Sequence, residues 1–274
     1  MNARGVVADG AARFFHSPVA GRFFTNAWYS LITALDRRGD ARFLNYGFAA
    51  LDGSRIALPA ELEPDRYAIQ LYDHVASRAA LEGTDVLEVG CGRGGGASYI
   101  AAARRVRRYV GLDRNRFAIT FDRRRYRRQH NLEFAAGDAN ALPFSAASFD
   151  AVLNVESSHH YGGLERFFAQ VHRVLRPGGM FLMACFPARD EPSLHDAVRR
   201  APFTCVLAED VTANVVRALE LDGARREEIV RRSCPPPLRP FAREFAGVPG
   251  SRLYEGFASG RVRYSNFVLR KATA

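Results

Sequence analysis

Apolar and polar positions change their period along this chain of 274 residues. From residue 83 onward, short apolar runs alternate with segments whose apolar side chains recur every three to four positions, as in buried strands and amphipathic helices. Elements that alternate at this spacing form a parallel sheet with helices on both faces. The pattern predicts strands over 85–89, 108–112, 131–135, 149–155 and 178–185, and helices over 96–104, 114–129 and 163–174.

The regions before and after this alternation follow other patterns. An aromatic-rich helical repeat precedes it, and residues 222–259 break the rhythm with consecutive prolines and several phenylalanines. This irregular segment lies between the last two predicted strands, which is a suitable place for a lid. The flanking patterns predict helices over 12–37, 64–81 and 211–221, and strands over 202–207 and 261–269.

Together these elements predict an α/β fold, a Rossmann-like doubly wound sheet of seven mostly parallel strands. We expect an N-terminal helical cap over 1–82 and a cofactor-binding core over 83–206. The core is followed by a helical lid or substrate region over 207–259. A C-terminal strand over 260–274 completes the core sheet.

The charge of the chain is strongly positive, with a formal net charge of +10. The densest arginine runs are 104–108 and 123–128, where exposed helices are expected. One interpretation is a patch for nucleic acid or an anionic membrane. The other is a solvated outer helix face, which we prefer because neither run carries aromatic side chains suited to stacking on bases. An acidic substrate or partner is the lesser alternative, and no nucleic-acid partner is expected.

Composition narrows the class of protein further. Hydrophobic residues make up 47% and charged residues 25% of the chain, as in ordinary globular proteins. No apolar run is long enough to span a membrane, and the first ten residues lack the apolar core of an export signal. The four cysteines show no C-x-x-C spacing, which fits a reducing compartment. We expect a cytoplasmic protein without stable membrane insertion, and leave a homo-oligomer open.

The segment 86–96, with the sequence VLEVGCGRGGG, joins the first predicted strand to the following helix. Five of its last seven residues are glycine, so no Cβ keeps the backbone from a bound ligand. Turns between a strand and a helix bind nucleotides in α/β sheets. The acidic Glu88 two positions before Gly90 indicates S-adenosylmethionine (SAM) rather than a dinucleotide.

Polar side chains also follow the next three predicted strands. Asp113 ends the second strand about 20 residues beyond the glycines, where a carboxylate can accept hydrogen bonds from both ribose hydroxyls. Asp138 follows the third strand and could bind an adenine amino group. The fourth strand runs to Asn154, near the expected reactive end of the cofactor. Because the carboxyl ends of parallel strands share one edge of the sheet, these residues converge on one crevice.

The chain resembles class I SAM-dependent methyltransferases of the small-molecule branch. The residues that carry the resemblance are VLEVGCGRGGG, YVGLD, GDANALPF and VHRVLRPGG, which together cover roughly residues 83–186. The resemblance implies that Gly90, Gly92 and Gly94 line the methionine and ribose, that Asp113 holds the ribose, and that Asp138 with Ala139 holds the adenine. The residues expected at the cofactor are completed by Tyr46, Glu88, Cys91, Arg114 and Asn154.

A narrower resemblance extends beyond the core. The segments RFLNYGFAALDG, NVESSHHYG and REFAGVPGSRLYEG, with the helix start GGGASY, are similar to phthiotriol dimycocerosate methyltransferases and related actinobacterial natural-product enzymes. It implies methylation of a hydroxyl on a polyketide, lipid or sugar, and we expect an apolar small-molecule acceptor. Tyr46 is expected to close over the cofactor or to face its sulfonium; core packing in the N-terminal cap is the alternative.

The segment 154–161 follows the fourth strand and supplies the candidate catalytic groups. A neutral histidine beside a hydroxyl acceptor can take its proton, which contributes about 10²–10⁴-fold. His159 is our first candidate for this general base and His160 the second, with Glu156 orienting the imidazole or lining the cofactor. Either histidine could instead cap a helix or pack beneath the lid. Glu156 and His159 also resemble half of a dinuclear metal site, but no second such motif exists, so no metal is expected.

Other functions are compatible with the same cofactor. An N- or C-methyltransferase of a small molecule is the nearest alternative, since Cys185 stands where related enzymes often carry an acid beside the substrate. A nucleic-acid methyltransferase is disfavoured because Asn-Val-Glu-Ser at 154–157 replaces the Asn-Pro-Pro-aromatic signature of enzymes that methylate base nitrogens. A SAM-binding scaffold that catalyses another reaction, such as a cyclisation, is the last alternative.

Overall fold

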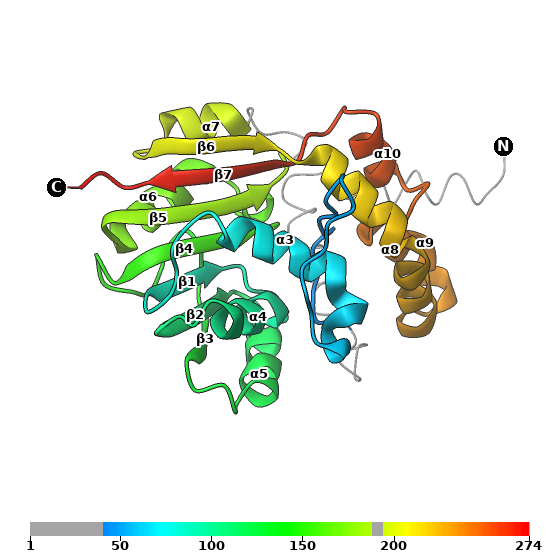
Figure 1. The fold of residues 1–274 in the computed structure, drawn as a ribbon, viewed down its shortest axis with the longest axis horizontal. Coiled ribbons are helices and arrows are strands. Elements are labelled where there is room, and N and C mark those ends of the chain that lie inside the picture. Colours follow the sequence, from blue (N-terminus) through cyan, green and yellow to red (C-terminus); the bar gives the residue numbers. More distant parts are fainter. Residues whose placement is uncertain (1–40, 188–193, 274) are drawn as a thin grey trace.

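A seven-stranded sheet forms the centre of the molecule (Figure 1). The computed structural model describes residues 41–187 and 194–273. The strands follow the order β3-β2-β1-β4-β5-β7-β6, with β7 antiparallel to both of its neighbours and the pairings among β1 to β5 parallel. The predicted mostly parallel doubly wound sheet is therefore confirmed. The strands are β1 (Asp85–Val89), β2 (Arg108–Asp113), β3 (Leu132–Ala136), β4 (Phe149–Val155), β5 (Leu175–Cys185), β6 (Thr204–Asp210) and β7 (Ser265–Arg270).

Helices cover both faces of the sheet, and each face has its own apolar core. One core packs side chains of α3, α4, α5, α8 and α10 against the sheet, and the other packs α6 and α7. The helices are α3 (Arg66–Ala76), α4 (Gly95–Ala103), α5 (Arg116–Arg125), α6 (Leu164–Val174), α7 (Leu194–Arg200), α8 (Thr212–Ser233), α9 (Arg239–Phe245) and α10 (Arg252–Ala258), with 3-10 turns η1 (Ala60–Asp65), η2 (Ser158–His160) and η3 (Pro236–Leu238).

The helix that follows β2 is shorter than predicted. The pattern predicts a helix over 114–129, whereas α5 spans Arg116–Arg125. Asn115 sets its start, because the side-chain oxygen of Asn115 accepts hydrogen bonds from the backbone N–H groups of Phe117 and Ala118. The helix predicted over 64–81 is also shorter in the structure. It corresponds to α3 (Arg66–Ala76), which the 3-10 turn η1 (Ala60–Asp65) precedes.

The helix after β6 is twice as long as predicted. The expected helix over 211–221 stops before Gly223, but α8 continues for 22 residues through that glycine. A Cβ on Gly223 would lie 3.0 Å from Cδ of Pro249, so the glycine allows close packing rather than ending the helix. The strand predicted over 202–207 is β6, which extends to Asp210, and α7 was not predicted. The helix expected over 12–37 lies outside the described residues.

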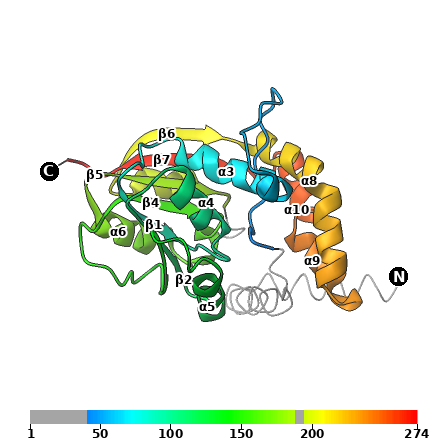
Figure 2. The same ribbon diagram turned by 60° about the horizontal axis from the view of Figure 1, so that its bottom comes forward.

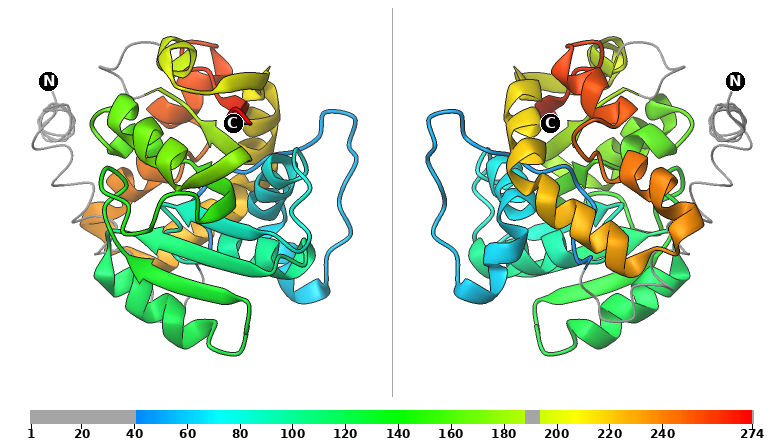
Figure 3. Two further views of the ribbon diagram at one scale, coloured as in Figure 1. Left: turned by 90° about the vertical axis from the view of Figure 1, so that its left-hand side faces the viewer. Right: turned by 90° about the vertical axis from the view of Figure 1, so that its right-hand side faces the viewer.

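The segment between β6 and β7 is largely helical. Helices α8, α9 and α10 lie beyond the end of the sheet at which the parallel strands terminate (Figures 1 and 2). Residues 41–49, which we call the strap, run between this helical group and α3 (Figure 1). The backbone of the strap is tied to both sides, because Phe48 N–H donates to the Tyr67 carbonyl and Ala49 N–H donates to the Asn214 carbonyl. The loop after the strap projects from the body of the molecule (Figure 3).

Candidate active site

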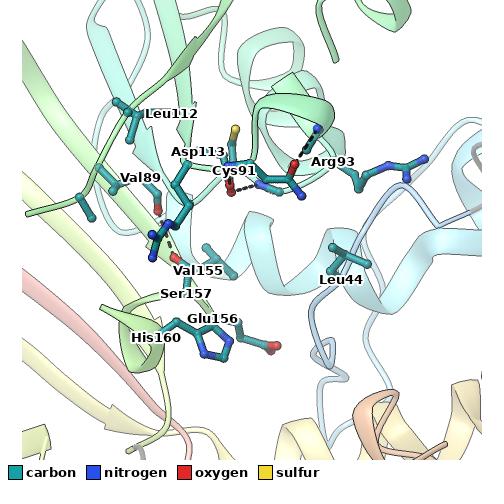
Figure 4. A pocket seen from close by; sticks show the side chains of 18 of the residues that line it. Leu44, Val89, Cys91, Arg93, Leu112, Asp113, Val155, Glu156, Ser157 and His160 are labelled. Carbon is teal, nitrogen blue, oxygen red and sulfur yellow. Dashed lines mark hydrogen bonds between the residues drawn. The ribbon is translucent and has the colours of Figure 1, made fainter. Parts of the chain in front are cut away.

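A cavity of about 820 Å³ opens at the carboxyl ends of β1, β2 and β4. Its walls come from the loops after these strands, from the loop after β3 and from the strap. Of the residues predicted to converge on one crevice, Gly90, Gly92, Asp113 and Asp138 line this cavity and Asn154 does not. Figure 4 shows part of the cavity. The lining residues are 42–45, 89–93, 112–118, 137–140, 155–157, 160 and 161, with Tyr72 and Gly96.

The glycine loop forms the floor of the cavity, at the carboxyl ends of β1 and β2. Gly90 and Gly92 line the cavity with φ of +82° and +56°, a conformation that favours glycine. A Cβ on Gly90 would overlap the Ser157 hydroxyl, so this glycine also permits the close approach of two loops. Gly94 does not line the cavity. A Cβ there would lie 2.8 Å from Cζ of Phe134, so Gly94 serves the packing of the loop against the sheet.

The carboxylate after β2 points into the cavity and braces the glycine loop (Figure 4). Asp113 Oδ2 accepts a hydrogen bond of 3.0 Å from Gly92 N–H, and its Oδ1 accepts one of 2.8 Å from Asn115 N–H. Burial raises the pKa of Asp113 above its ordinary value. Arg114, Asp138 and Ala139 also line this part of the cavity, as does the buried thiol of Cys91.

Besides Gly94, three residues expected at the cofactor lie behind the cavity wall, and two of them are buried polar groups. Glu88 is fully buried and accepts hydrogen bonds from the hydroxyls of Tyr72 (2.7 Å) and Tyr109 (2.9 Å). Asn154 Nδ2 donates to the Val89 carbonyl (2.9 Å) and so ties β4 to the end of β1. Neither side chain lines the cavity. Burial raises the pKa of Glu88 to about 7.

Tyr46 is the third residue outside the cavity wall. Its ring packs against Phe186 and Phe257, and its hydroxyl donates to the Phe245 carbonyl (3.3 Å). The backbone N–H of Tyr46 donates to Glu156 Oε1 (2.8 Å). The strap residues that line the cavity are those just before it, from Arg42 to Asn45.

Of the candidate catalytic groups, Glu156 and His160 line the cavity and His159 does not (Figure 4). His159 Nδ1 lies 3.4 Å from Cys185 Sγ, and its ring centroid lies 4.4 Å from that of Phe186. Glu156 forms hydrogen bonds with Tyr46 and Tyr264. The structure therefore brings together Glu156 and His160 as the two titratable candidates beyond the glycine loop.

Burial shifts the pKa values of these two groups in opposite directions. It raises the pKa of the Glu156 carboxyl to about 8 and lowers the pKa of His160 to about 4. Both groups are therefore uncharged near pH 7. Glu156 also has a φ of +50°, an unusual conformation for a residue with a side chain, and such strain concentrates at functional sites.

Cys185 is a buried thiol below η2. The Ser158 hydroxyl donates to its sulfur at 3.1 Å, and burial raises the pKa of Cys185 to about 11. The thiol is therefore uncharged and poorly suited to act as a nucleophile.

Several residues of the cavity were not predicted from the sequence. Tyr72 lies in a helical repeat typical of core residues, and its ring fills the space that a Cβ on Gly96 would need. Ser157 and Tyr161 hydrogen-bond to each other (2.7 Å) and to the Val89 carbonyl.

Among the described residues, no group of three or more His, Cys, Asp or Glu side chains could hold a metal ion. No helix in residues 41–187 and 194–273 has the length and apolar character needed to cross a membrane.

The site fits a nucleoside with an amino-acid tail. The cavity has the volume for one, the glycine backbone forms an open floor, and a carboxylate stands at the end of β2, where a ribose would lie. Together with a seven-stranded sheet in which β7 runs against both of its neighbours, these features define the class of SAM-dependent methyltransferases.

Comparison with known proteins supports the assignment to the SAM-dependent methyltransferases. The model of the methyltransferase domain family matches residues 87–183. A fatty-acid O-methyltransferase from Mycolicibacterium smegmatis is 41% identical over 89% of this chain and 88% of its own. A phthiotriol/phenolphthiotriol dimycocerosates methyltransferase from Mycobacterium tuberculosis is 37% identical over 89% of this chain and 90% of its own. The chain belongs to this family of SAM-dependent methyltransferases, as the sequence motifs predicted.

Solved structures share the fold at lower identity. The [4+2]-cyclase SpnF superposes with a TM-score of 0.68 at 21% identity, over 91% of this chain and 96% of its own. A geranyl diphosphate methyltransferase solved with SAM has a TM-score of 0.62 at 18% identity, over 84% of this chain and 99% of its own. The cofactor of the present enzyme is SAM, in agreement with the glycine loop.

Proposed function

We propose that this enzyme transfers a methyl group from SAM to a hydroxyl of an apolar small molecule, a lipid or polyketide, in the cytoplasm. The observation that carries the proposal is that Glu156 and His160 line one cavity beside the glycine loop, both uncharged near neutral pH. The names of the two relatives, a fatty-acid and a phthiotriol methyltransferase, support the acceptor class.

The residues of the cavity would hold the cofactor by its three parts. We assign the methionine and ribose to the backbone of Gly90 and Gly92, the ribose hydroxyls to Asp113, and the adenine to Asp138 with Ala139. When bound, SAM supplies a strongly electrophilic methyl group. The task of the protein is then to align the acceptor oxygen, for which well-oriented pairs reach effective molarities of about 10⁵–10⁸ M.

His160 is the proposed general base. A neutral imidazole can accept the hydroxyl proton as the oxygen becomes bonded to carbon. We prefer it to His159 because His160 lines the cavity, whereas His159 packs against Cys185 and Phe186.

Glu156 is the proposed acceptor-binding acid. Its Oε1 accepts hydrogen bonds from Tyr46 N–H and the Tyr264 hydroxyl, which leaves Oε2 to carry the proton. With a pKa of about 8 the carboxyl is protonated at pH 7 and can donate a hydrogen bond to the acceptor oxygen. One acceptor hydroxyl could then donate to His160 and accept from Glu156.

Helices α8 to α10 and the strap form the proposed roof over the acceptor. These elements stand at the end of the sheet where the cavity opens, and α10 contributes the buried Phe257 to the packing around Tyr46. A roof of this kind excludes water and favours an apolar acceptor.

The test is a pH profile of methyl transfer from labelled SAM to hydroxylated lipid or polyketide acceptors. We expect a bell-shaped kcat that rises as His160 loses its proton near pH 4 and falls as Glu156 ionises near pH 8. Glu156→Gln keeps a neutral hydrogen-bond donor, so it should abolish the alkaline fall and retain much of kcat, whereas Glu156→Ala should lower kcat at every pH.

The histidines are compared in the same assay. His160→Gln should reduce kcat by about 10²–10⁴-fold with little change in SAM affinity, and His159→Gln should reduce it far less. An inactive Glu156→Gln with an unaffected His160→Gln would assign the base to Glu156 and overturn the proposed roles. Analysis of the product linkage (ether, ester, amine or carbon) distinguishes O-methylation from N- or C-methylation.

A carboxylate acceptor is the second candidate, because the relative with 41% identity is named for fatty acids. A carboxylate has no proton to lose, so it needs no general base. The neutral acid Glu156 can donate a hydrogen bond to it as well. With a fatty-acid substrate, His160→Gln should then be nearly as active as the unchanged enzyme, and the product would be a base-labile methyl ester.

A further inference from the structure

One peptide unit of the strap lies between a carboxyl group and a guanidinium group. The peptide that joins Asn45 to Tyr46 donates through its N–H to Glu156 Oε1 at 2.8 Å. The carbonyl of the same peptide accepts from Nη2 of Arg226 at 3.1 Å. The chain Arg226–peptide–Glu156 therefore links α8 of the proposed roof to the loop after β4, which lines the cavity.

Arg226 is itself held tightly in place. Its side chain is buried, and its Nη2 also donates to the Tyr46 carbonyl (3.1 Å) while its Nη1 donates to the Ala246 carbonyl (3.0 Å). Asp222, one helical turn earlier on α8, lies 2.9 Å from Nε and balances the charge. A planar guanidinium can serve these partners at once, which an ammonium cannot.

We propose that Arg226 is a positioning residue, which fixes the Asn45–Tyr46 peptide and thereby the orientation of the acceptor-binding carboxyl of Glu156. A hydrogen-bonded peptide is polarised by a cation on its carbonyl side, so its N–H becomes a stronger donor. The position of α8 then determines whether the carboxyl is correctly aimed. The part of this inference that concerns Glu156 rests on the proposed function.

The surroundings of Glu156 make the effect measurable as a change in pKa. Burial raises its pKa, while the Tyr46 N–H, the Tyr264 hydroxyl and the charge of Arg226 lower it. The other titratable groups near this carboxyl are the hydroxyl of Tyr72 on α3, the thiol of Cys185 on β5 and the imidazole of His160, which lines the same cavity. Burial raises the pKa of the first two and lowers that of His160, so all three are uncharged near pH 7. Among the described residues, Arg226 is thus the cation whose charge lowers the pKa of Glu156.

The experiment compares Arg226→Met, Arg226→Lys and Arg225→Met in the full chain. Arg225 is the matched control, because it is adjacent on α8 and shares Asp222 with Arg226. Its hydrogen bonds go to the side chains of Asp222 and Asp65, whereas those of Arg226 go to backbone carbonyls, two of them in the strap. Arg226→Met should move the alkaline limb of the kcat profile up by about one pH unit and lower kcat by roughly tenfold. Arg226→Lys should keep the limb nearer its original pH and still lose kcat. Arg225→Met should leave the limb in place.

Hydrogen exchange supplies a readout that is independent of activity. The amide of Tyr46 should exchange faster in both Arg226 variants and at the original rate in Arg225→Met. The inference would be overturned if the Tyr46 amide exchanged at the same rate in Arg226→Met and Arg225→Met and if kcat fell at the same alkaline pH in both variants. If Glu156→Gln keeps the alkaline limb, the proposed role of Glu156 fails. Faster Tyr46 exchange in the Arg226 variants would then still support the positioning of the strap.

Discussion

At the scale of single residues, the site depends on places where a side chain cannot fit. Gly90 combines a φ of +82° with a position at which a Cβ would overlap the Ser157 hydroxyl. Ser157 in turn donates to the Val89 carbonyl, so the loops after β1 and β4 touch at this glycine. The cavity floor exists because both loops approach without a side chain between them.

Gly90→Ala should therefore abolish SAM binding as measured by titration calorimetry. The matched control is Gly53→Ala, because Gly53 has a φ of +79° but a Cβ added there would meet no atom within 4 Å. Both variants carry the backbone strain of about 1–2 kcal/mol, and only Gly90→Ala also displaces the Ser157 loop. Similar SAM affinities in the two variants would show that the contact with Ser157 does not matter.

At the scale of secondary-structure elements, α6 supports the cavity from the face of the sheet that it shares with α7. Its apolar stripe is fully buried at Phe167 and Phe168, which pack on Phe181 of β5. The Phe167 ring also meets Tyr161, which lines the cavity, with 4.8 Å between centroids. Packing of α6 therefore helps to set the position of the loop that carries His160.

Phe167→Ala should lower the free energy of unfolding by about 3–5 kcal/mol, because it leaves a void in a tightly packed core. Phe117→Ala is the comparison, since Phe117 is 74% exposed and its loss should change stability by less than about 0.5 kcal/mol. Urea denaturation without ligand measures both values. A cost for Phe167→Ala as small as that of Phe117→Ala would contradict the packing role of α6.

At the scale of the whole molecule, buried acids connect stability to pH. Burial raises the pKa of Glu88 to about 7 and those of Asp122 and Glu156 to about 8. In the unfolded chain these groups lose their protons near pH 4, so at pH 6.5–8 the folded state binds more protons. Stability then falls as the pH rises through this window. The buried histidines His159 and His160 have lowered pKa values and act in the opposite sense, but below about pH 6.5.

We expect the melting temperature to decline between pH 6.5 and pH 8 at constant ionic strength. Asp122→Asn should make the decline shallower, because neither carboxyl oxygen of this fully buried residue has a hydrogen-bond partner among the described residues. Asp196→Asn on the exposed surface of α7 should leave the slope unchanged. A melting temperature that rises with pH across this window would contradict the expectation.

The sequence by itself determined the sheet, the cofactor and the strands that carry the site. Strand and helix periods depend on local backbone geometry, and the glycine loop and Asp113 depend on which residues follow a strand, so both can be recognised along the chain. Gly223 misled the prediction of α8 because its role depends on Pro249, a contact with a later segment of the chain.

Tertiary structure decided which candidates face the cavity. Glu88, Tyr46 and Asn154 lie at the expected places in the chain but behind the wall, and His160 rather than the adjacent His159 lines the cavity. Neighbours in sequence point in different directions, and only packing against other elements determines which side chain meets the ligand. The same holds for the Arg226–peptide–Glu156 chain. Tyr46 is 180 residues from Arg226 and 110 residues from Glu156 in the sequence, and the three meet only because α8 packs over the strap.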